Sequence, residues 1–290
     1  MNSDLKQLGI AALQEAHTTF LKLVQDGSAR QDVGQNQFGE MAMQIDISSE
    51  EVVIKHLRAY SDKTKQGIRV VSEEHGELVV GDKPALTAFL DGFDGSSVFR
   101  DSQGKARGGT MFSLYEGADP RFQDYLLGGI VDHILGKLVV ASKGNGTLLM
   151  ADGKTSTAHV SDTKVLDSST NIDIDEGVQN YPTFPSHEQG YFYDSIKSAF
   201  KTRYVGSSAV YFFDLAVGVT DVVLEYGRKN NLEHMVAYPL IIESGGVMEF
   251  VSGGDLGPTH YSDYCAMDGG YPAIIAASSP ALADVARRYH

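Results

Sequence analysis

The sequence predicts an α/β protein, with elements stacked as α/β/α/β/α layers. Three observations support this prediction. Apolar residues recur at three- and four-residue steps near the start of the chain, and short apolar segments separated by glycines fill its first half. In the second half, helical and extended segments alternate. We expect one integrated unit with an α+β half over residues 1–155 and an α/β half over residues 156–290.

The first half is predicted to begin with helices and to continue as a mostly antiparallel sheet. Five residues share one face of an opening amphipathic helix: Leu5, Leu8, Ala12, Ala16 and Phe20. Residues 26–40 are polar and rich in glycine and glutamine, which predicts a loop. Ser48 with Glu51 forms a capping-box pattern that would start a second helix. Strands are then expected at 69–71, 86–90, 110–115, 127–132, 137–141 and 147–149.

A polar stretch at 151–170 is predicted to connect the two halves. Beyond it, apolar periodicity predicts strands at 171–175, 221–226, 247–250 and 273–276. Helices are predicted at 192–200, 206–217 and 231–244, and a last helix after Ser279-Pro280, where proline occupies the first turn.

The composition limits the classes of function. The chain of 290 residues is long enough for a sizeable core, and no run reaches the roughly 18 consecutive apolar residues of a membrane span. We expect a cytoplasmic protein, because the N-terminus lacks a secretory signal and the single cysteine, Cys265, excludes an intramolecular disulfide. The net charge of −14 argues against nucleic acid or anionic membrane as a partner. An anionic substrate would need bound cations to reverse the local field.

The most informative segment runs from Asp91 to Phe99, with the sequence Asp-Gly-Phe-Asp-Gly-Ser-Ser-Val-Phe. Two carboxylates stand three positions apart at the end of an apolar run, and a glycine and two hydroxyl groups follow them. Free N–H groups at a helix start bind anions, and carboxylate oxygens bind hard cations such as Mg²⁺. The segment therefore predicts a place where metal and phosphate lie side by side.

Other carboxylates are expected to join this segment. Glu73 and Glu74 end one predicted strand, Asp91 and Asp94 end the next, and Glu233 opens a helix in the second half. An isolated Asp-x-x-Asp is most often a solvated turn, but strand ends of one sheet can converge on a shared cleft. Two Mg²⁺ ions roughly 3.5–4 Å apart would stabilise the attacking and leaving oxygens of an in-line displacement.

In this arrangement the sequence resembles the inositol monophosphatase and fructose-1,6-bisphosphatase superfamily, which comprises Mg²⁺-dependent, often lithium-sensitive phosphatases with a layered αβαβα fold. Residues 91–96 are similar to the Asp-Pro-Ile/Leu-Asp-Gly-Thr/Ser signature of that family. Asp46, Glu73 and Glu233 match other acidic positions of the family in the same order. Residues 203–209 resemble its Arg-x-x-Gly-Ser-x-Ala segment, so the matches span about residues 35–255.

The resemblance implies a set of metal ligands. Glu73, Asp91 and the Phe93 carbonyl would hold a first Mg²⁺, and Asp91, Asp94 and Glu233 would hold a second. Glu73 would also reach a third, weaker ion through water. Mn²⁺ is expected to substitute for Mg²⁺.

The resemblance also implies catalytic and substrate-binding residues. The catalytic set would be Asp46, Glu73 and Ser96, of which Asp46 and Ser96 orient the attacking water. Phosphate would be cradled by Gly95, Ser96 and Ser97. The implied substrate-binding residues are Gly206, Ser207, Ser208 and Glu225. From their charge, Arg203 and Lys229 are further substrate-binding candidates that would suit a second phosphate, and solvated surface charge is the alternative for each. The reaction would be direct hydrolysis without a phosphoenzyme.

Several residues depart from the family pattern. Gly92 replaces the usual proline, which is expected to loosen the loop between the aspartates, and Glu233 replaces an aspartate. The main hypothesis is a Mg²⁺-dependent phosphomonoesterase, expected as a homodimer, acting on inositol monophosphate or fructose 1,6-bisphosphate as its small-metabolite partner. A 3′-phosphoadenosine phosphate phosphatase is an alternative. A noncatalytic or weakly active ligand-binding relative with an altered second metal site is another.

Overall fold

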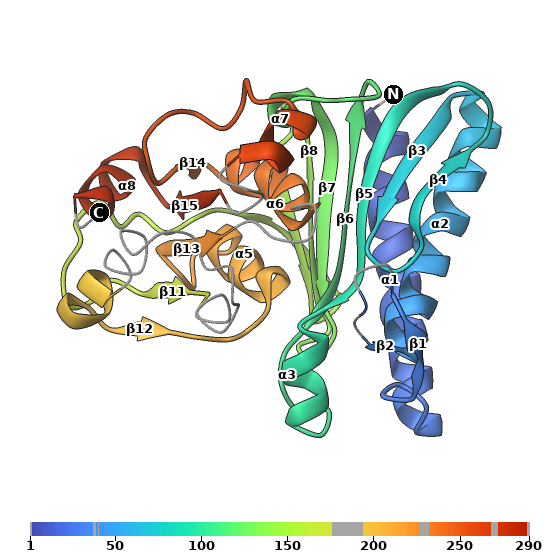
Figure 1. The fold of residues 1–290 in the computed structure, drawn as a ribbon, viewed down its shortest axis with the longest axis horizontal. Coiled ribbons are helices and arrows are strands. Elements are labelled where there is room, and N and C mark those ends of the chain that lie inside the picture. The colour runs from blue at the N-terminus through green and yellow to red at the C-terminus, as the bar shows by residue number, and fades with distance from the viewer. Residues whose placement is uncertain are drawn as a thin grey trace.

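The computed structural model describes residues 2–36, 39, 41–175, 194–226, 232–267 and 272–288. Its elements form five layers (Figure 1). Helices α1 (Asn2–Asp26) and α2 (Gln44–Thr64) cover one face of a large sheet, and α5 (Ser208–Ala216) and α6 (Leu232–Glu243) cover the other. A smaller sheet follows, with α8 (Pro280–Arg287) beyond it. The predicted α/β/α/β/α stack is confirmed.

The large sheet has eight strands in the order β10-β9-β8-β7-β6-β5-β3-β4. Its strands are β3 (Gly67–Ser72), β4 (Gly76–Val80), β5 (Pro84–Asp94), β6 (Gly109–Glu116), β7 (Tyr125–Asp132), β8 (Lys137–Ser142), β9 (Thr147–Ala151) and β10 (Lys154–Ala158). All neighbouring pairs are antiparallel except β3 and β5, which run parallel. The predicted mostly antiparallel sheet is therefore confirmed.

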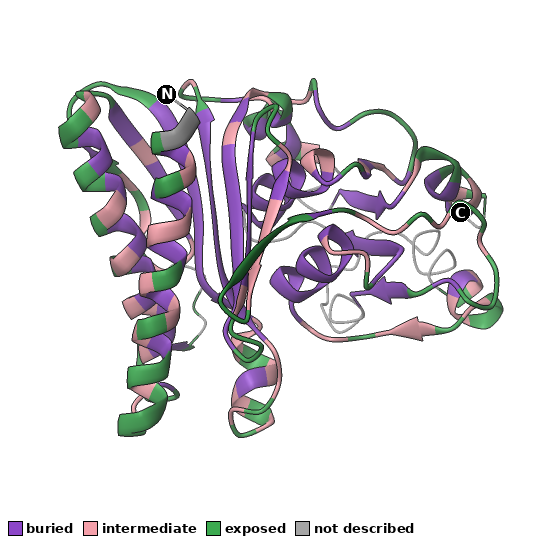
Figure 2. Ribbon diagram, turned by 180° about the vertical axis from the view of Figure 1, so that it is seen from behind, coloured by how far each residue is buried: buried purple, intermediate pink, exposed green. Residues whose placement is uncertain are grey.

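Alternating side chains of β5 supply two cores. Ala88 and Leu90 lie in the apolar cluster formed with α1 and α2, whereas Phe89 lies in the cluster formed with α5 and α6. This alternation follows from the two-residue period of a strand. The central strands β5 to β8 are largely buried on both faces, while the outer faces of α1 and α2 are exposed (Figure 2).

The smaller sheet has five strands in the order β12-β11-β13-β15-β14. They are β11 (Ile172–Ile174), β12 (Thr202–Arg203), β13 (Val222–Tyr226), β14 (Val247–Phe250) and β15 (Ala273–Ala277), and a short helix covers 194–199. Strand β11 pairs in parallel with β12 and β13, and the other pairs are antiparallel. The remaining short helices are α3 (Ser96–Asp101), η1 (Phe122–Asp124) and α7 (Tyr261–Ala266).

Two predictions near the N-terminus are corrected. The expected loop at 26–40 contains strand β1 (Asp32–Gln35), which pairs with β2 (Met41–Met43). The capping box at Ser48 is wrong, because α2 already begins at Gln44. Asp46 in its first turn accepts a hydrogen bond of 2.6 Å from the Met43 N–H, and this contact caps the helix in place of Ser48.

The polar connection between the halves is partly a strand. Residues 154–158 form β10 at the edge of the large sheet, with mostly exposed side chains, which is why hydropathy did not reveal it. Glycines 144 and 146 lie in the hairpin turn between β8 and β9. Their N–H groups donate to the Glu243 carboxylate at 2.7 and 2.8 Å.

Within the part of the chain that the structure describes, every helix is too short or too polar to cross a bilayer.

Candidate metal centre

Strand β5 brings its terminal carboxylates to the side of the sheet that faces the second half of the chain. Asp91 lies two residues after Phe89, so both side chains project toward α6. The parallel pairing of β3 with β5 sets Glu73 beside Asp91, since the Glu73 N–H donates to the Leu90 carbonyl at 3.2 Å. Two carboxylates therefore meet where the neighbouring strands β3 and β5 end, as predicted.

A β-bulge separates Asp91 from Asp94. In the pairing of β5 with β6, Asp91 faces Met111 and Asp94 faces Gly109, so the register shifts between them. A Cβ atom at Gly92 would lie 2.0 Å from the Asp46 carbonyl oxygen. Proline is therefore sterically incompatible with this position, and Gly92 permits a close approach of β5 to α2. This close approach, and not the expected loosening of the loop, explains the glycine at position 92.

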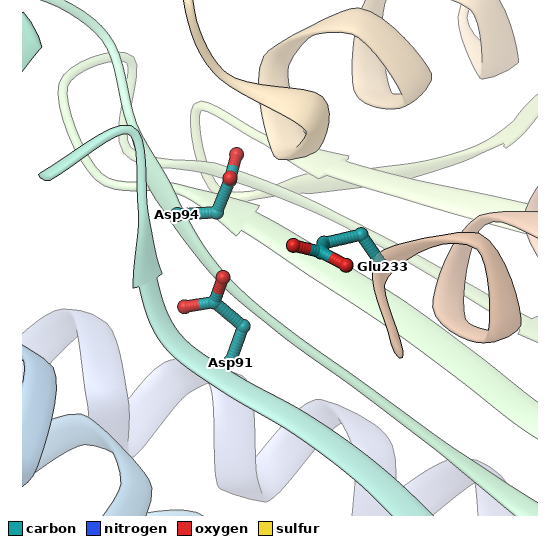
Figure 3. A group of neighbouring side chains, drawn as sticks. All are labelled: Asp91, Asp94 and Glu233. Atoms are coloured by element: carbon teal, nitrogen blue, oxygen red, sulfur yellow. The ribbon is translucent and has the colours of Figure 1, made fainter. Parts of the chain in front are cut away.

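Three buried carboxylates converge from both halves of the chain. Asp91 is 3% exposed, and Asp94 and Glu233 are each 8% exposed. One carboxylate oxygen from each lies within 4.8 Å of the others. Figure 3 shows the side chains directed toward a common space, Asp91 and Asp94 from β5 and Glu233 from the start of α6. The predicted convergence of these three residues is confirmed.

The electrostatics of this cluster fit a divalent cation. Burial raises the pKa of Asp91 well above its usual value, and the negative charges of Glu73, Asp94 and Glu233 raise it further, as does a side-chain hydrogen bond with Glu73. Buried carboxylates that repel one another are stable in the ionised form only with a compensating cation. An all-oxygen donor set is the type that Mg²⁺ and Mn²⁺ bind. The residues present therefore fit a site for such ions.

Asp46 provides a further acceptor. Its Oδ2 accepts from the Met43 N–H, while its Oδ1 is buried and has no hydrogen-bond partner among the residues that the structure describes. Burial raises the pKa of Asp46 well above its ordinary value, and nearby Glu74, Glu73 and Glu50 add to the increase, although the bond from Met43 acts in the opposite sense. An unsatisfied buried oxygen is costly unless a water or ion completes it.

Asp94 is held by the second half of the chain. Ser207 Oγ donates to its Oδ2 at 2.6 Å, and the Ala209 N–H donates to the same oxygen at 2.7 Å. Gly95 lies against Ser207, because a Cβ at residue 95 would be 2.9 Å from the serine Cβ. Ser207, predicted to bind substrate, is 1% exposed and supports the Asp94 carboxylate of the acidic cluster in this structure.

The predicted phosphate cradle lies at the beginning of α3. Gly95 precedes the helix with a φ of +93°, a left-handed conformation that glycine adopts without strain. The first helical hydrogen bond joins the Phe99 N–H to the Gly95 carbonyl at 3.0 Å. The N–H groups of residues 96–98, which precede this bond, therefore have no acceptor within the helix. Ser96 is half-buried and Ser97 is exposed.

Two further predicted substrate residues are buried within a hydrogen-bonded chain. Ser208 donates to Glu225 Oε1, and the other Glu225 oxygen lies 3.3 Å from His234 Nε2. His234 Nδ1 in turn bonds the Tyr264 hydroxyl. The neighbouring Gly206 has a φ of +74°, and its N–H donates to the Tyr211 hydroxyl at 2.9 Å.

Arg203 belongs to an ion-pair network. It bonds Asp173 at 2.7 and 2.8 Å and Asp214 at 3.1 Å. Asp214 also accepts two bonds from Arg107, at 2.8 and 2.9 Å, and Arg107 pairs with Asp132 at 2.6 Å. The guanidinium predicted for substrate is thus bound by protein carboxylates. Lys229, the other cation predicted for substrate, lies outside the described residues.

One supporting residue was missed from the sequence. Glu50 is fully buried, and it accepts from the Glu74 N–H at 3.2 Å, from Ser72 Oγ and from His75 Nδ1 at 2.6 Å. The His75 pKa is raised by this bond. Glu50 thereby fixes the turn that carries Glu73. Its position four residues after Asp46 on α2 was the available signal, because residues i and i+4 share a helix face.

Comparison with known proteins gives structural matches alone. No family model and no curated protein sequence matches the chain. The extragenic suppressor protein suhB from Bartonella henselae superposes with a TM-score of 0.74 at 18% identity, covering 98% of this chain and 97% of that chain. Inositol monophosphatase II from Staphylococcus aureus, with inositol monophosphate bound, gives 0.70 at 15% identity over 98% and 93%. An inositol monophosphatase–fructose 1,6-bisphosphatase gives 0.70 at 19% identity over 98% and 98%.

These superpositions cover nearly the whole length of each chain, so the likeness extends over both halves of the fold. The expectation drawn from the sequence signature is confirmed at the level of the fold. The chain therefore has the fold of the inositol monophosphatase structures.

Proposed function

We propose that the chain is a divalent-metal-dependent phosphomonoesterase whose substrate is a small phosphorylated polyol or sugar. The observation that carries the proposal is the buried cluster of Asp91, Asp94 and Glu233, set within a fold shared with inositol monophosphatases. A buried group of carboxylates on a chain of net charge −14 can receive an anionic ester only when cations are bound.

The geometry of the cluster and the sequence signature support the following assignment of metal ligands. Asp91, Asp94 and Glu233 would hold one ion, and Glu73 with Asp91 and the Phe93 carbonyl would hold another. Bound Mg²⁺ or Mn²⁺ would polarise the phosphoryl oxygens and neutralise the charge that develops during hydrolysis. Ser207 and the Ala209 N–H keep the Asp94 carboxylate oriented toward the cluster.

The chain's own groups would handle water and phosphate. Asp46 Oδ1 is a buried acceptor that can receive a proton of the attacking water, with Ser96 as the second orienting group. Gly95, Ser96 and Ser97 would bind the phosphate oxygens through backbone N–H groups and hydroxyls. Burial of the aspartates limits competing water, so each acceptor acts in a medium of low dielectric constant.

The ion pairs that Arg203 makes within the protein favour substrates with one phosphate. Its guanidinium bonds Asp173 and Asp214, which leaves it poorly placed for a second substrate phosphate. Inositol monophosphate is therefore our first candidate, ahead of fructose 1,6-bisphosphate and 3′-phosphoadenosine 5′-phosphate.

Phosphate release from these three esters tests the proposal. We expect release with Mg²⁺ or Mn²⁺, none after chelation, and none from Asp91→Asn with metal present. Asp62→Asn is the matched control, because Asp62 is exposed on α2 away from the cluster. Absence of release from all three esters, or release unaffected by chelation, would refute the proposal.

The noncatalytic alternative is tested in the same experiment. It was motivated by Glu233, yet the Glu233 carboxylate reaches the same cluster as the two aspartates. Calorimetric titration with Mn²⁺ that gives a single binding event, together with no turnover of any ester, would favour that alternative.

A further inference from the structure

The bulge in β5 removes a backbone partner from Gly92, and a side chain of β6 replaces it. Gly92 lies between Asp91 and Asp94, where the register with β6 shifts. Its carbonyl accepts a hydrogen bond of 2.6 Å from Thr110 Oγ1, and this contact is buried. A buried carbonyl without such a donor would be costly, so the bulge depends on the hydroxyl of Thr110.

His133 completes this arrangement. Its Nε2 lies 2.8 Å from Thr110 Oγ1. The single hydroxyl proton of Thr110 is directed to Gly92, so Thr110 can only accept from His133, which fixes the proton on Nε2. On the other side, His133 Nδ1 lies 3.3 Å from Nδ1 of His17, a residue of α1. The hydrogen bonds therefore run in one direction, from His17 through His133 and Thr110 to Gly92.

Packing holds the His133 ring in this orientation. The ring is 2% exposed and stacks on Phe93, with centroids 5.5 Å apart and an interplanar angle of 4°. It also stacks on Phe20 at 4.7 Å. The His133 backbone N–H donates to the Gly108 carbonyl at 3.1 Å, which fixes the residue at the end of β7. A ring held by two aromatic side chains and by the backbone is well suited to position another group.

We propose that Thr110 and His133 are positioning residues for the metal centre: through the Gly92 carbonyl they set the bulge that directs Asp91 and Asp94 to the same space. The inference rests on the proposed function, because it assigns these residues to that site. They act through Gly92 alone and bind neither substrate nor metal.

The first test compares Thr110→Val with Thr110→Ser. Valine removes the hydroxyl with little change of volume, whereas serine retains it. Thr87→Val is the matched control: Thr87 is also buried on this sheet, and its hydroxyl donates to the Gly117 carbonyl at 2.7 Å, near the opposite end of β5. Each variant is titrated calorimetrically with Mn²⁺, and amide hydrogen exchange of Phe93 is measured in metal-free protein.

We expect Thr110→Val to bind Mn²⁺ about tenfold more weakly, the loss typical for outer partners of metal ligands. The Phe93 amide, which donates to Asp91 Oδ1 at 2.9 Å, should exchange faster. Thr110→Ser should restore both values, and Thr87→Val should leave both at the wild-type level.

A second pair separates the hydrogen bond of His133 from its packing. Phenylalanine keeps the stack on Phe93 and Phe20 but has no donor, whereas glutamine carries an amide N–H near the position of Nε2. We expect His133→Phe to lose Mn²⁺ affinity about tenfold and His133→Gln to recover most of it. If Thr110→Val does not fold while Thr87→Val does, the Mn²⁺ affinities of His133→Phe and His133→Gln test the inference instead.

The inference is overturned if Thr110→Val and His133→Phe bind Mn²⁺ as tightly as wild type, or if the conservative variants fail to restore the affinity. A failure of the proposed function gives a different outcome from a failure of this inference. Mn²⁺ binding without phosphate release would refute the phosphatase proposal and leave the inference standing. A wild-type chain that binds no Mn²⁺ would overturn both.

Discussion

Ser207 donates a hydrogen bond of 2.6 Å to the Asp94 carboxylate, although 113 residues separate them in the chain. Ser207 is also the N-cap of α5, since its Oγ accepts from the Val210 N–H at 3.3 Å. One side chain thus caps a helix of the second half and orients a carboxylate of the first. The candidate metal centre therefore exists only when both halves are folded together.

Ser207→Ala is expected to weaken Mn²⁺ binding about tenfold, because Asp94 Oδ2 loses the Ser207 hydroxyl that, with the Ala209 N–H, holds it in place. Calorimetric titration measures the affinity. Ser198→Ala is the control, since Ser198 donates to the Ser195 carbonyl on an exposed surface. Unchanged Mn²⁺ affinity in Ser207→Ala would show that Ser207 does not support the site.

Glu233→Asp is expected to reduce turnover by at least about tenfold. The shorter side chain withdraws the carboxylate from Asp91 and Asp94 by about 1.5 Å, and loss of an outer partner alone typically costs that factor. Glu233→Gln, which keeps the length and removes the charge, should reduce turnover further. Initial rates of phosphate release at saturating Mg²⁺ check both variants. An increase in rate on Glu233→Asp would instead favour a degraded metal site in the natural chain.

Gly92→Ala is expected to destabilise the protein by about 1–3 kcal/mol, because the new methyl group would lie 2.0 Å from the Asp46 carbonyl oxygen. Urea unfolding measures the free energy. Gly153→Asn is a suitable control, since Gly153 has no atom within 4 Å of a built Cβ and its φ of +72° is one that asparagine tolerates. Equal stability of Gly92→Ala and wild type would contradict the close approach of β5 to α2.

Arg107→Met is expected to lower the free energy of unfolding by about 3–5 kcal/mol, because it removes the cation that pairs with the buried carboxylates of Asp132 and Asp214. Arg121→Met should cost far less, since the pair of Arg121 with Asp124 is largely solvated. Chemical denaturation with chelator present measures both variants. Similar losses for the two arginines would mean that the network around Asp214 contributes no more than a surface pair.

Stability without metal should fall as the pH rises from acidic to neutral values. The folded pKa values of Asp91 and Asp46 lie well above the unfolded value near 3.8, so the folded state binds these protons more tightly. Their contribution is complete below the unfolded pKa and is lost as the pH passes through the raised folded values. Urea unfolding of the metal-free protein over a pH series checks this, and Asp91→Asn should flatten the profile. A pH profile in Asp91→Asn identical to that of the wild type would contradict a contribution of Asp91 to this pH dependence.

Local patterns predicted most of the fold. The apolar period of α1, the short runs of β5 to β8 and the proline start of α8 agree with the structure, because each depends on a few neighbouring residues. The start of α2 was misplaced, since Asp46 caps the helix ahead of the Ser48 pattern. Strand β10 was missed because an exposed edge strand has no apolar alternation.

The acidic core of the site was also predictable, because Asp91, Asp94 and Glu233 stand at the ends or starts of recognisable elements. Its supports were not. Ser207 and Thr110 act on residues 94 and 92 through contacts that only the packed sheet and helices create. Such partners carry no local signal, since a serine at a helix start has the same pattern whether or not a carboxylate lies above it.

Anomalous diffraction from crystals soaked in Mn²⁺ tests the central claim most directly. We expect manganese peaks within coordination distance of the Asp91, Asp94 and Glu233 carboxylates, with Glu73 contributing to one of them. Manganese bound only elsewhere, with these carboxylates left without an ion at saturating Mn²⁺, would contradict the account.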